Sequence, residues 1–402
     1  MNATPPLIVH VVYRFAVGGL ENGVVNLINR LPPQSWRHAV ISLTDVDAAF
    51  AARLSSAAVG CVALHKAPGH AVRLYPRLVA LLRELKPAIV HTRNLAALEA
   101  TLPAWIAGVP ARLHGEHGRD VGDLDGSSRR YQRVRRLFRP FVTRYVALSP
   151  DLASYLRERV GVPATRIDQV YNGVDTARFR PAPGGRAAID ACPFREADHW
   201  LVGTVGRMEK VKDQINLARA FVSAVCADPE ARARLRLVLV GDGKLKREVE
   251  TILESAGVRE LAWFAGERAD VVPLLQGLDC FVLPSLAEGV SNTILEAMAC
   301  GLPVVATRVG ANAELVEQDV TGRTVPAADS DALAREIGAY FTTPALARQH
   351  GQAGRRRVER RFSLERMVDD YDRVYRGLLR THRPVRSAAA AAAPRPGVRS
   401  QD

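Results

Sequence analysis

Short apolar segments alternate with helical patterns along most of this chain, and this alternation constrains its fold more than any other feature. Most of these segments lack a polar residue at every second position, so we expect both faces of each predicted strand to be buried. Buried strands joined by helices form a parallel sheet covered on both faces, which is the doubly wound α/β architecture. The predicted strands lie at 7–13, 38–43, 88–91, 111–114, 145–148, 200–205, 235–240, 263–265, 280–283 and 303–306.

The pattern occurs twice, separated by a linker that contains proline and glycine, and the length of 402 residues also favours two domains. We therefore expect two Rossmann-like domains. The sequence predicts an N-terminal domain at 1–175, a C-terminal domain at 176–362, a terminal helix at 363–382 and a disordered tail at 383–402. Ser363 is the expected cap of the terminal helix.

The formal net charge of +13 predicts attraction to polyanions. The sequence has no helix-turn-helix, zinc-finger or aromatic-basic pattern, so nucleic acid is not an expected partner. It has no uncharged apolar run of about 18 residues, which a transmembrane helix needs. No secretory leader is evident, and the five cysteines are scattered. We expect a cytoplasmic protein, with the inner face of the plasma membrane as a further candidate location.

Two glutamates occupy an otherwise uncharged stretch between two predicted strands. Glu296 lies on a short apolar helix predicted at 293–300, and Glu288 lies in the loop one turn before it. A carboxylate on such a helix is costly unless a partner hydrogen-bonds it, and the N–H groups at the helix start attract anions. Two acceptors beside an anion site suit a nucleotide sugar. The alternative is a helix whose single glutamate pairs with an arginine from elsewhere.

The residues that flank this helix predict its ends. Ser291 or Asn292 can cap the start, Gly301 can end it, and Pro303 prevents its continuation. The helix start therefore lies directly beside both glutamates.

Two cations follow the first predicted strand of the second domain. Gly206 would let the backbone approach a ligand, while Arg207 and Lys212 would project from the carboxyl end of a strand, where open α/β sheets bind ligands. They could stabilise the charge that builds up on a departing diphosphate, so we expect no metal ion and no other cofactor. Taken alone, such cations are usually solvated.

Glycine turns follow three other predicted strands. Gly18 and Gly19 can place N–H groups near phosphate, and Gly241 lies in a Gly-Asp-Gly turn. Gly266 and Arg268 follow a further strand. Ordinary tight turns are the alternative for each.

Two histidines, His114 and His117, follow a predicted strand of the first domain in the sequence His-Gly-Glu-His-Gly. Either could face the cleft, and Glu116 could orient either one. A structural role is the alternative for both.

Two further patterns carry a weaker signal. Asp-x-Asp, which can bind a metal, occurs at 45–47, 123–125 and 329–331 in unrelated contexts. The segment 129–141 holds six arginines, and on a helix Val134, Leu137, Phe138 and Phe141 would share one stripe. This segment either packs on its own sheet or contacts an anionic membrane or an anionic lipid-linked acceptor.

The segment from Glu288 to Val305 resembles the Glu-x7-Glu signature of the family 4 retaining glycosyltransferases, and the other motifs occur in that family's order. The resemblance covers nearly the whole chain to about residue 379. It implies the GT-B fold, with two domains facing across a cleft and a terminal helix that returns to the first domain. Asp213 departs from the family pattern, in which glycine follows the lysine. The run His114 to Asp120 looks like bacterial sugar transferases of exopolysaccharide assembly.

The resemblance also implies roles for the candidate residues. Glu296 would accept hydrogen bonds from ribose hydroxyls, Glu288 would contact the donor sugar, Arg207 and Lys212 would hold the diphosphate, and His117 rather than His114 would reach the sugar. The donor would be a UDP- or GDP-linked sugar, and the acceptor would be a glycan or a lipid-linked acceptor. The implied donor-binding residues are Gly18, Gly19, Gly206, Gly241, Gly266, Arg268, Gly289, Val290, Ser291, Asn292 and Glu296.

Two other functions remain as alternatives. A nucleotide-sugar epimerase of the same architecture would convert the donor without an acceptor. A non-catalytic protein that binds nucleotide sugar or anionic lipid would have no need for all four of Arg207, Lys212, Glu288 and Glu296.

Overall fold

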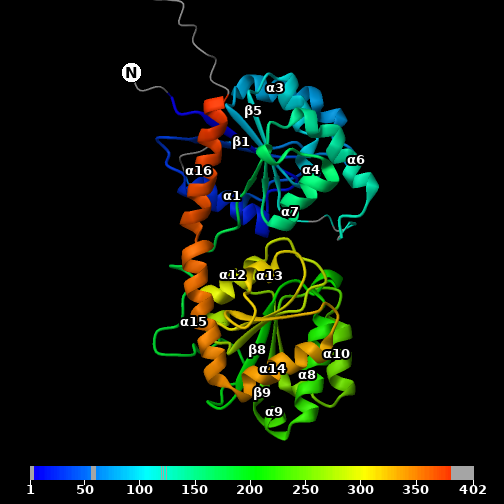
Figure 1. The fold of residues 1–402 in the computed structure, drawn as a ribbon, viewed down its shortest axis with the longest axis vertical. Helices are drawn as coiled ribbons and strands as arrows, with labels where there is room; N and C mark the ends of the chain where they lie inside the picture. The colour runs from blue at the N-terminus through cyan, green and yellow to red at the C-terminus, as the bar shows by residue number, and fades with distance from the viewer. Residues whose placement is uncertain (1–3, 56–59, 119, 121, 124, 382–402) are drawn as a thin grey trace, which may run out of the picture.

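The computed structural model describes residues 4–55, 60–118, 120, 122–123 and 125–381. It contains two parallel sheets, one above the other along the long axis of the molecule, each covered by helices (Figure 1). The upper sheet consists of β1 (Leu7–Val12), β2 (Arg37–Ser42), β3 (Cys61–Ala63), β4 (Ile89–Arg93), β5 (Ala111–Glu116), β6 (Arg144–Ala147) and β7 (Ile167–Gln169). The lower sheet consists of β8 (Trp200–Val205), β9 (Leu235–Val240), β10 (Ala262–Gly266), β11 (Cys280–Leu283), β12 (Val304–Thr307) and β13 (Gly322–Val325).

Both sheets have the doubly wound strand order. The upper order is β3-β2-β1-β4-β5-β6-β7 and the lower order is β10-β9-β8-β11-β12-β13. The direction of winding reverses between β1 and β4 and again between β8 and β11. Ligands of open α/β sheets bind beyond the carboxyl ends of the strands at such reversals, so the loops that follow these four strands are the first places to look for a site.

Helices connect the strands. The upper domain has α1 (Gly19–Arg30), α2 (Ala48–Ala51), α3 (Tyr75–Leu85), α4 (Asn94–Leu98), α5 (Thr101–Ile106), α6 (Arg129–Phe138) and α7 (Pro150–Tyr155). The lower domain has α8 (Gln214–Ala227), α9 (Pro229–Arg234), α10 (Lys246–Ser255), α11 (Val271–Gln276), α12 (Asn292–Ala299), α13 (Asn312–Leu315), α14 (Ser330–Thr342) and α15 (Pro344–Arg361). Single helical turns lie at Val72–Leu74, Arg139–Phe141, Leu156–Val160, Ala164–Arg166, Lys210–Lys212 and Arg259–Leu261.

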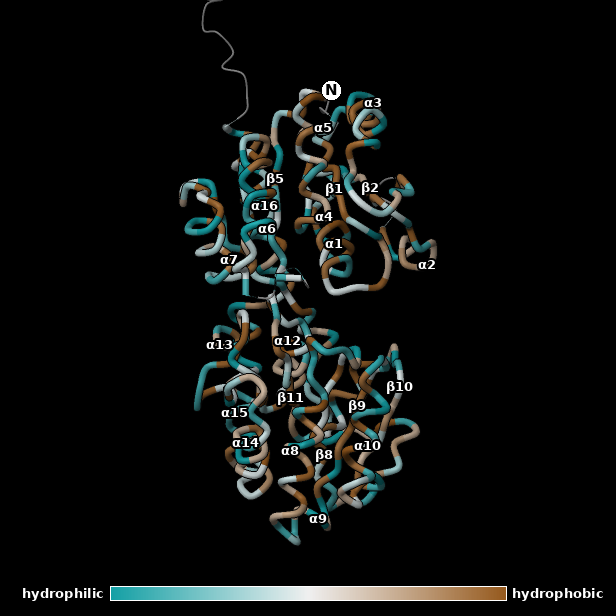
Figure 2. Tube along the Cα trace, turned by 90° about the vertical axis from the view of Figure 1, so that its right-hand side faces the viewer, coloured by the Kyte–Doolittle hydropathy of each residue, from teal (hydrophilic) through white to brown (hydrophobic). Residues whose placement is uncertain are grey.

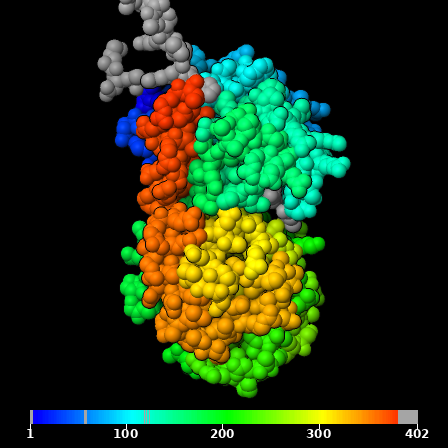
Figure 3. Space-filling model, in the orientation of Figure 1, coloured from blue at the N-terminus to red at the C-terminus, as the bar shows by residue number. Residues whose placement is uncertain are grey.

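The last helix, α16 (Leu364–Thr381), returns to the upper domain, as predicted. Ser363 caps its start by accepting a hydrogen bond from the N–H of Arg366. Trp36 Nε1 donates to Asp372 Oδ1 at 2.7 Å, and the Tyr375 hydroxyl lies 2.8 Å from His91 Nδ1. In the space-filling view α15 and α16 form one orange-to-red band along the side of both domains (Figure 3).

The prediction of two doubly wound domains is confirmed, and apolar residues gather in the strands at the centre of each domain (Figure 2). The sequence reading missed β3, β7 and β13. Each is at the edge of its sheet and pairs on one side only, so its sequence need not carry a continuous apolar run. Within the described part of the chain, no helix has the length and apolar character needed to cross a membrane. The predicted tail at 383–402 lies outside the described residues.

The arginine-rich segment forms α6, but the apolar stripe predicted on it is partly wrong. Phe138 is buried, whereas the Leu137 side chain is 67% exposed. Arg135, by contrast, is only 4% exposed and faces the sheet. The reason is a pair of carboxylates beneath the helix, described below, that draws the guanidinium inward.

Candidate active site

A cavity of about 630 Å³ lies between the two domains. Its lining comes from α1 above and from α12 and the loop before α11 below, and includes Gly19, Asn22, Arg268, Asn292, Thr293 and Glu296. The two walls approach closely at Gly19, because a Cβ placed there would lie 3.2 Å from Asn292 Nδ2. Asn172, in the segment that joins the domains, donates to Asn292 Oδ1 at 2.9 Å. Predicted residues from both domains therefore line one cavity.

Helix α12 carries Glu296 into this cavity. Ser291 caps the helix through its hydroxyl, which accepts the Ile294 N–H, and Gly301 follows the helix end with a left-handed φ of +79°. Burial raises the pKa of Glu296 to about 7, against a smaller opposing effect of Arg178. The carboxylate is thus largely removed from water and has no strong counter-charge. Hydroxyl groups of a ligand that donate hydrogen bonds to it would therefore stabilise its ionised form.

Glu288 and Lys212 form an ion pair at the reversal between β8 and β11. Lys212 Nζ lies 2.5 Å from Glu288 Oε1, and Ser285 Oγ donates to the same oxygen at 2.7 Å. The Leu286 N–H also donates to the Val211 carbonyl at 2.8 Å, which joins the two loops. Asp213, which stands where the family has glycine, adopts the left-handed conformation that favours glycine, with φ of +47°. The departure from the pattern therefore leaves the loop turn in place.

Arg207 follows Gly206 beyond the carboxyl end of β8, and its side chain is exposed. Within the described ranges it forms no ion pair, whereas Lys212, five residues later, is paired with Glu288. Gly241 is required by packing, because a Cβ there would lie 2.2 Å from the Gly206 carbonyl oxygen. Gly241 N–H in turn donates to the Gly266 carbonyl at 2.8 Å. These glycines bring three loop backbones together at the sheet edge.

The remaining candidates of the lower domain divide into two groups. Arg268 lines the cavity and is also tied to Asp270, with Nε donating to Oδ1 at 2.7 Å. Gly289 and Val290 lie at the cleft, where a Cβ on Gly289 would lie 2.5 Å from the His117 carbonyl oxygen and 2.9 Å from Gly118 Cα. Only glycine permits this approach of the two domains.

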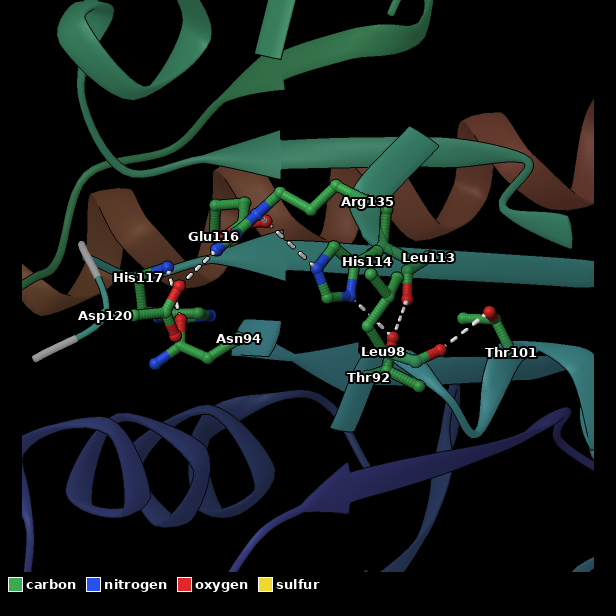
Figure 4. A network of polar contacts seen from close by, with 10 residues as sticks. All are labelled: Thr92, Asn94, Leu98, Thr101, Leu113, His114, Glu116, His117, Asp120 and Arg135. Carbon is green, nitrogen blue, oxygen red and sulfur yellow. Dashed lines mark hydrogen bonds and ion pairs between the residues drawn. The ribbon is translucent and has the colours of Figure 1, made fainter. Parts of the chain in front are cut away.

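The two histidines of the upper domain differ in their surroundings (Figure 4). His114 is inside β5, with Nδ1 2.8 Å from Thr92 Oγ1 and Nε2 3.4 Å from Glu116 Oε1. Both of its ring nitrogens have partners, which is typical of a structural residue. His117 follows β5 at the cleft, and among the residues that the structure describes its buried Nε2 has no hydrogen-bond partner.

The charge state of His117 follows from its burial. Burial, with a further contribution from the Arg93 guanidinium, lowers its pKa well below the ordinary value, so the ring is neutral at pH 7. Its backbone N–H donates to Asn94 Oδ1 at 2.8 Å. Sequence reasoning missed Asn94, although its place three residues after the strand predicted at 88–91 could have signalled it.

Gly18 and Gly19 lie at the start of α1, above the same cleft. Gly18 has extended backbone and caps the helix, while the Glu21 carboxylate folds against it, 2.2 Å from where a Cβ would lie. Gly19 therefore offers the first free N–H groups of a 12-residue helix to the cavity.

In the three Asp-x-Asp motifs, aspartate side chains accept hydrogen bonds from nearby backbone N–H groups and do not form a common site. Asp47 caps α2, Asp329 caps α14, and Asp123 accepts the Ser128 N–H at 2.8 Å. The described residues contain no cluster of three His, Cys, Asp or Glu side chains suited to a metal. Independence of metal stays a prediction.

Comparisons with known proteins agree with this architecture. A family model described as Glycosyltransferase Family 4 matches residues 17–178, and one described as Glycosyl transferases group 1 matches residues 200–342. The chain is 35% identical over 244 residues to the lipopolysaccharide core biosynthesis mannosyltransferase LpcC of Rhizobium leguminosarum bv. viciae, which covers 59% of this chain and 65% of LpcC. Several other curated relatives are matched over about half of their length.

Two further similarities span more of the chain. It is 25% identical over 304 residues to the UDP-Gal:alpha-D-GlcNAc-diphosphoundecaprenol alpha-1,3-galactosyltransferase of Escherichia coli, covering 74% of this chain and 77% of that one. The crystal structure of Anabaena HepE in complex with UDP and glucose superposes with a TM-score of 0.77 at 21% identity, covering 92% of this chain and all of HepE. At that identity the structural likeness shows the fold alone.

Proposed function

Because the chain belongs to the family 4 glycosyltransferases, we propose that it transfers a sugar from a UDP- or GDP-linked donor to a glycan or lipid-linked acceptor in bacterial polysaccharide biosynthesis. The observation that carries this proposal is that Glu296 lines the interdomain cavity, while Glu288, ion-paired with Lys212, directly precedes Gly289, which lies against His117 and Gly118 of the upper domain. The HepE complex, which holds UDP and glucose, supports a nucleotide sugar as the donor.

The donor is proposed to occupy the cavity with its ribose on Glu296. The sugar then lies toward Glu288 and His117, and the diphosphate lies between Lys212 and the N–H groups at the starts of α1 and α12. Lys212 is already paired with Glu288, so its ammonium is held at the cleft before the donor arrives. Arg207, whose exposed side chain follows Gly206 at the carboxyl end of β8, would reach the diphosphate as a second cation.

Retention of the anomeric configuration is part of this proposal. The acceptor hydroxyl attacks the anomeric carbon on the face that the diphosphate leaves. The carbon–oxygen bond to the phosphate breaks as the bond to the acceptor oxygen forms, and the acceptor proton passes to the departing phosphate oxygen. Lys212 and Arg207 stabilise the charge on that diphosphate, which is the role a metal ion has in other enzymes. We propose no protein nucleophile.

We also propose that the arginine-rich face of α6 contacts the anionic inner face of the plasma membrane, where a lipid-linked acceptor would be found. Leu137 of α6 is 67% exposed, and Trp105 of α5, which is 53% exposed, has its ring 5.5 Å from the ring of Phe141, just beyond the end of α6. Arginines around exposed apolar side chains suit an interface with anionic lipid.

The test is product analysis with purified protein, a panel of UDP- and GDP-linked sugars and a lipid extract as acceptor. Transfer that depends on the acceptor and yields a glycosidic bond of the donor's configuration, read from the anomeric proton coupling, would support the proposal. Conversion of the donor alone into an epimer would assign the chain to the isomerase alternative. Binding of a sugar nucleotide without any turnover would assign it to the non-catalytic alternative.

A further inference from the structure

The loop that carries His117 is held at three points, and two of them belong to one side chain. Asn94 Oδ1 accepts the His117 N–H at 2.8 Å. Arg135 Nε and Nη2 donate to the two oxygens of Glu116 at 2.6 and 3.1 Å. Arg135 Nη2 also donates to Asp120 Oδ2 at 2.8 Å. The guanidinium thus links the residue before His117 to a residue three positions after it (Figure 4).

Because the charged groups of this arrangement are buried, their positions are tightly restricted. Glu116 is 1% exposed and Arg135 4%, so both ions are removed from water. The Arg135 guanidinium holds the pKa of Glu116 well below its usual range against the effect of burial, and the two carboxylates raise the pKa of Arg135. A buried ion of this kind tolerates little displacement, because a carboxylate left without its partner is strongly destabilised.

Arg135 makes more interactions than would be needed only to pack α6 against the sheet. Fastening α6 to β5 needs only the Arg135–Glu116 pair, and an apolar contact would stabilise that junction at least as well. The bond to Asp120 instead reaches the loop beyond the strand. On the opposite side, Asn94 holds the His117 N–H from a left-handed backbone with φ of +56°, a conformation that asparagine tolerates better than most residues. The loop is therefore held from both of its flanks.

The loop needs this fixation because it meets the other domain. The His117 carbonyl and Gly118 lie against Gly289, where not even a Cβ could be accommodated. A shift of the loop would either open this contact or turn the His117 ring away from the sugar position.

We propose that Arg135 is a positioning residue, which acts through Glu116 and Asp120 to hold His117 against the lower domain in the productive orientation. This inference rests on the proposed function. It assigns one arginine of α6 to the active site, while its exposed neighbours face outward.

The test is a double-variant cycle on the full chain, with the UDP- or GDP-linked sugar that gives wild-type turnover. Arg135→Gln should lower kcat by about 10- to 10²-fold, the scale for a misplaced catalytic group, with a change in donor KM below about threefold. If the residue acts through His117, the same substitution in a His117→Ala background should lower kcat by less than about twofold. Equal losses in both backgrounds would overturn the inference.

A matched control and a second route keep the test decisive. Arg144→Gln removes a similar two-bond pair between an arginine and a carboxylate, that of Arg144 with Asp168. This pair lies at the amino end of β6, away from the carboxyl ends of the strands where His117 lies, so the substitution should leave kcat within about twofold. If Arg135→Gln fails to fold, Asp120→Asn weakens the bond from Arg135 to the loop beyond the strand and leaves the Arg135–Glu116 pair in place. A loss of kcat that disappears in the His117→Ala background supports the inference, and an unchanged kcat contradicts it.

The possible failures are distinguishable. An active wild type whose Arg135 and His117 effects simply add would overturn the positioning role and leave the proposed function standing. A wild type that turns over none of the sugars would overturn the proposed function and this inference with it.

Discussion

The pKa of Glu296 makes donor affinity depend on pH in a defined direction. In the free protein burial raises this pKa to about 7, so the carboxyl is protonated below pH 7 and ionised above it. A ribose diol donates its hydrogens to the ionised form. We therefore expect donor binding to release a proton and to weaken as the pH falls.

The size of the effect follows from the two protonation states. We take the pKa of the carboxyl to return to an ordinary value of roughly 4.3 when the donor binds, so that only the ionised form of the free protein binds the donor. The apparent Kd is then the Kd of the ionised form multiplied by a factor, the reciprocal of the ionised fraction of the free carboxyl. That factor is about 11 at pH 6 and about 1.1 at pH 8, so Kd should rise about tenfold between pH 8 and pH 6.

Isothermal titration calorimetry with a nucleotide sugar measures this directly. A nucleotide sugar is preferable to a nucleoside diphosphate, because a terminal phosphate titrates near pH 6 and would add its own slope. Glu296→Gln should bind more weakly at pH 8 and lose the pH dependence. Glu314→Gln is a matched control, since Glu314 is another half-buried carboxyl with a raised pKa but is not part of the cavity lining. A wild-type Kd that is the same at pH 6 and pH 8 would refute the assignment of Glu296 to the ribose.

Four further outcomes are expected. Arg207→Ala and Lys212→Ala should each lower turnover by about 10²–10³-fold, the scale for losing one charged donor in the transition state, and near-normal rates in both would contradict their role. EDTA should leave sugar transfer intact, and a strict need for Mg²⁺ or Mn²⁺ would contradict the metal-free mechanism. Burial lowers the pKa of His38 to about 4, so the free energy of unfolding should be fully retained above pH 6.5 and fall by about 3 kcal/mol as the pH drops to 4, a loss that His38→Gln should reduce in thermal unfolding scans. Sedimentation with vesicles that contain phosphatidylglycerol should be weakened in Arg133→Glu and Leu137→Ser, whereas binding to neutral vesicles as strong as to anionic ones would refute the charged interface.

The fold was predictable because its signal is repeated. Central strands such as β8 and β9 are apolar on both faces, and their predicted bounds are those observed. The edge strands β3, β7 and β13 were not predicted, since one side of each faces no neighbour and their sequences are short and mixed, whereas the edge strand β10 was predicted from its apolar run at 263–265. The start of α12 was predicted to within one residue from two candidate caps, Ser291 and Asn292, and Ser291 is the cap in the structure.

The site was predictable only where a local motif marks it. Glu288 and Lys212 are 76 positions apart, and their contact depends on the reversal of strand order between β8 and β11. Arg135 could not be separated from the five other arginines of its segment, because helical spacing alone does not show which one meets a buried carboxylate. Leu137 was misplaced for the same reason.

The path of the chain between the domains has a consequence for protein engineering. Val174 on the outward path pairs with the return path twice, through the Phe362 carbonyl at 2.9 Å and the Leu364 N–H at 3.0 Å. The upper domain is thus assembled from two separate stretches of the gene, one before this crossing and the other α16. A chimera that exchanges the upper domain between relatives must therefore exchange both stretches together. A single splice would combine the upper sheet of one protein with the α16 helix of the other.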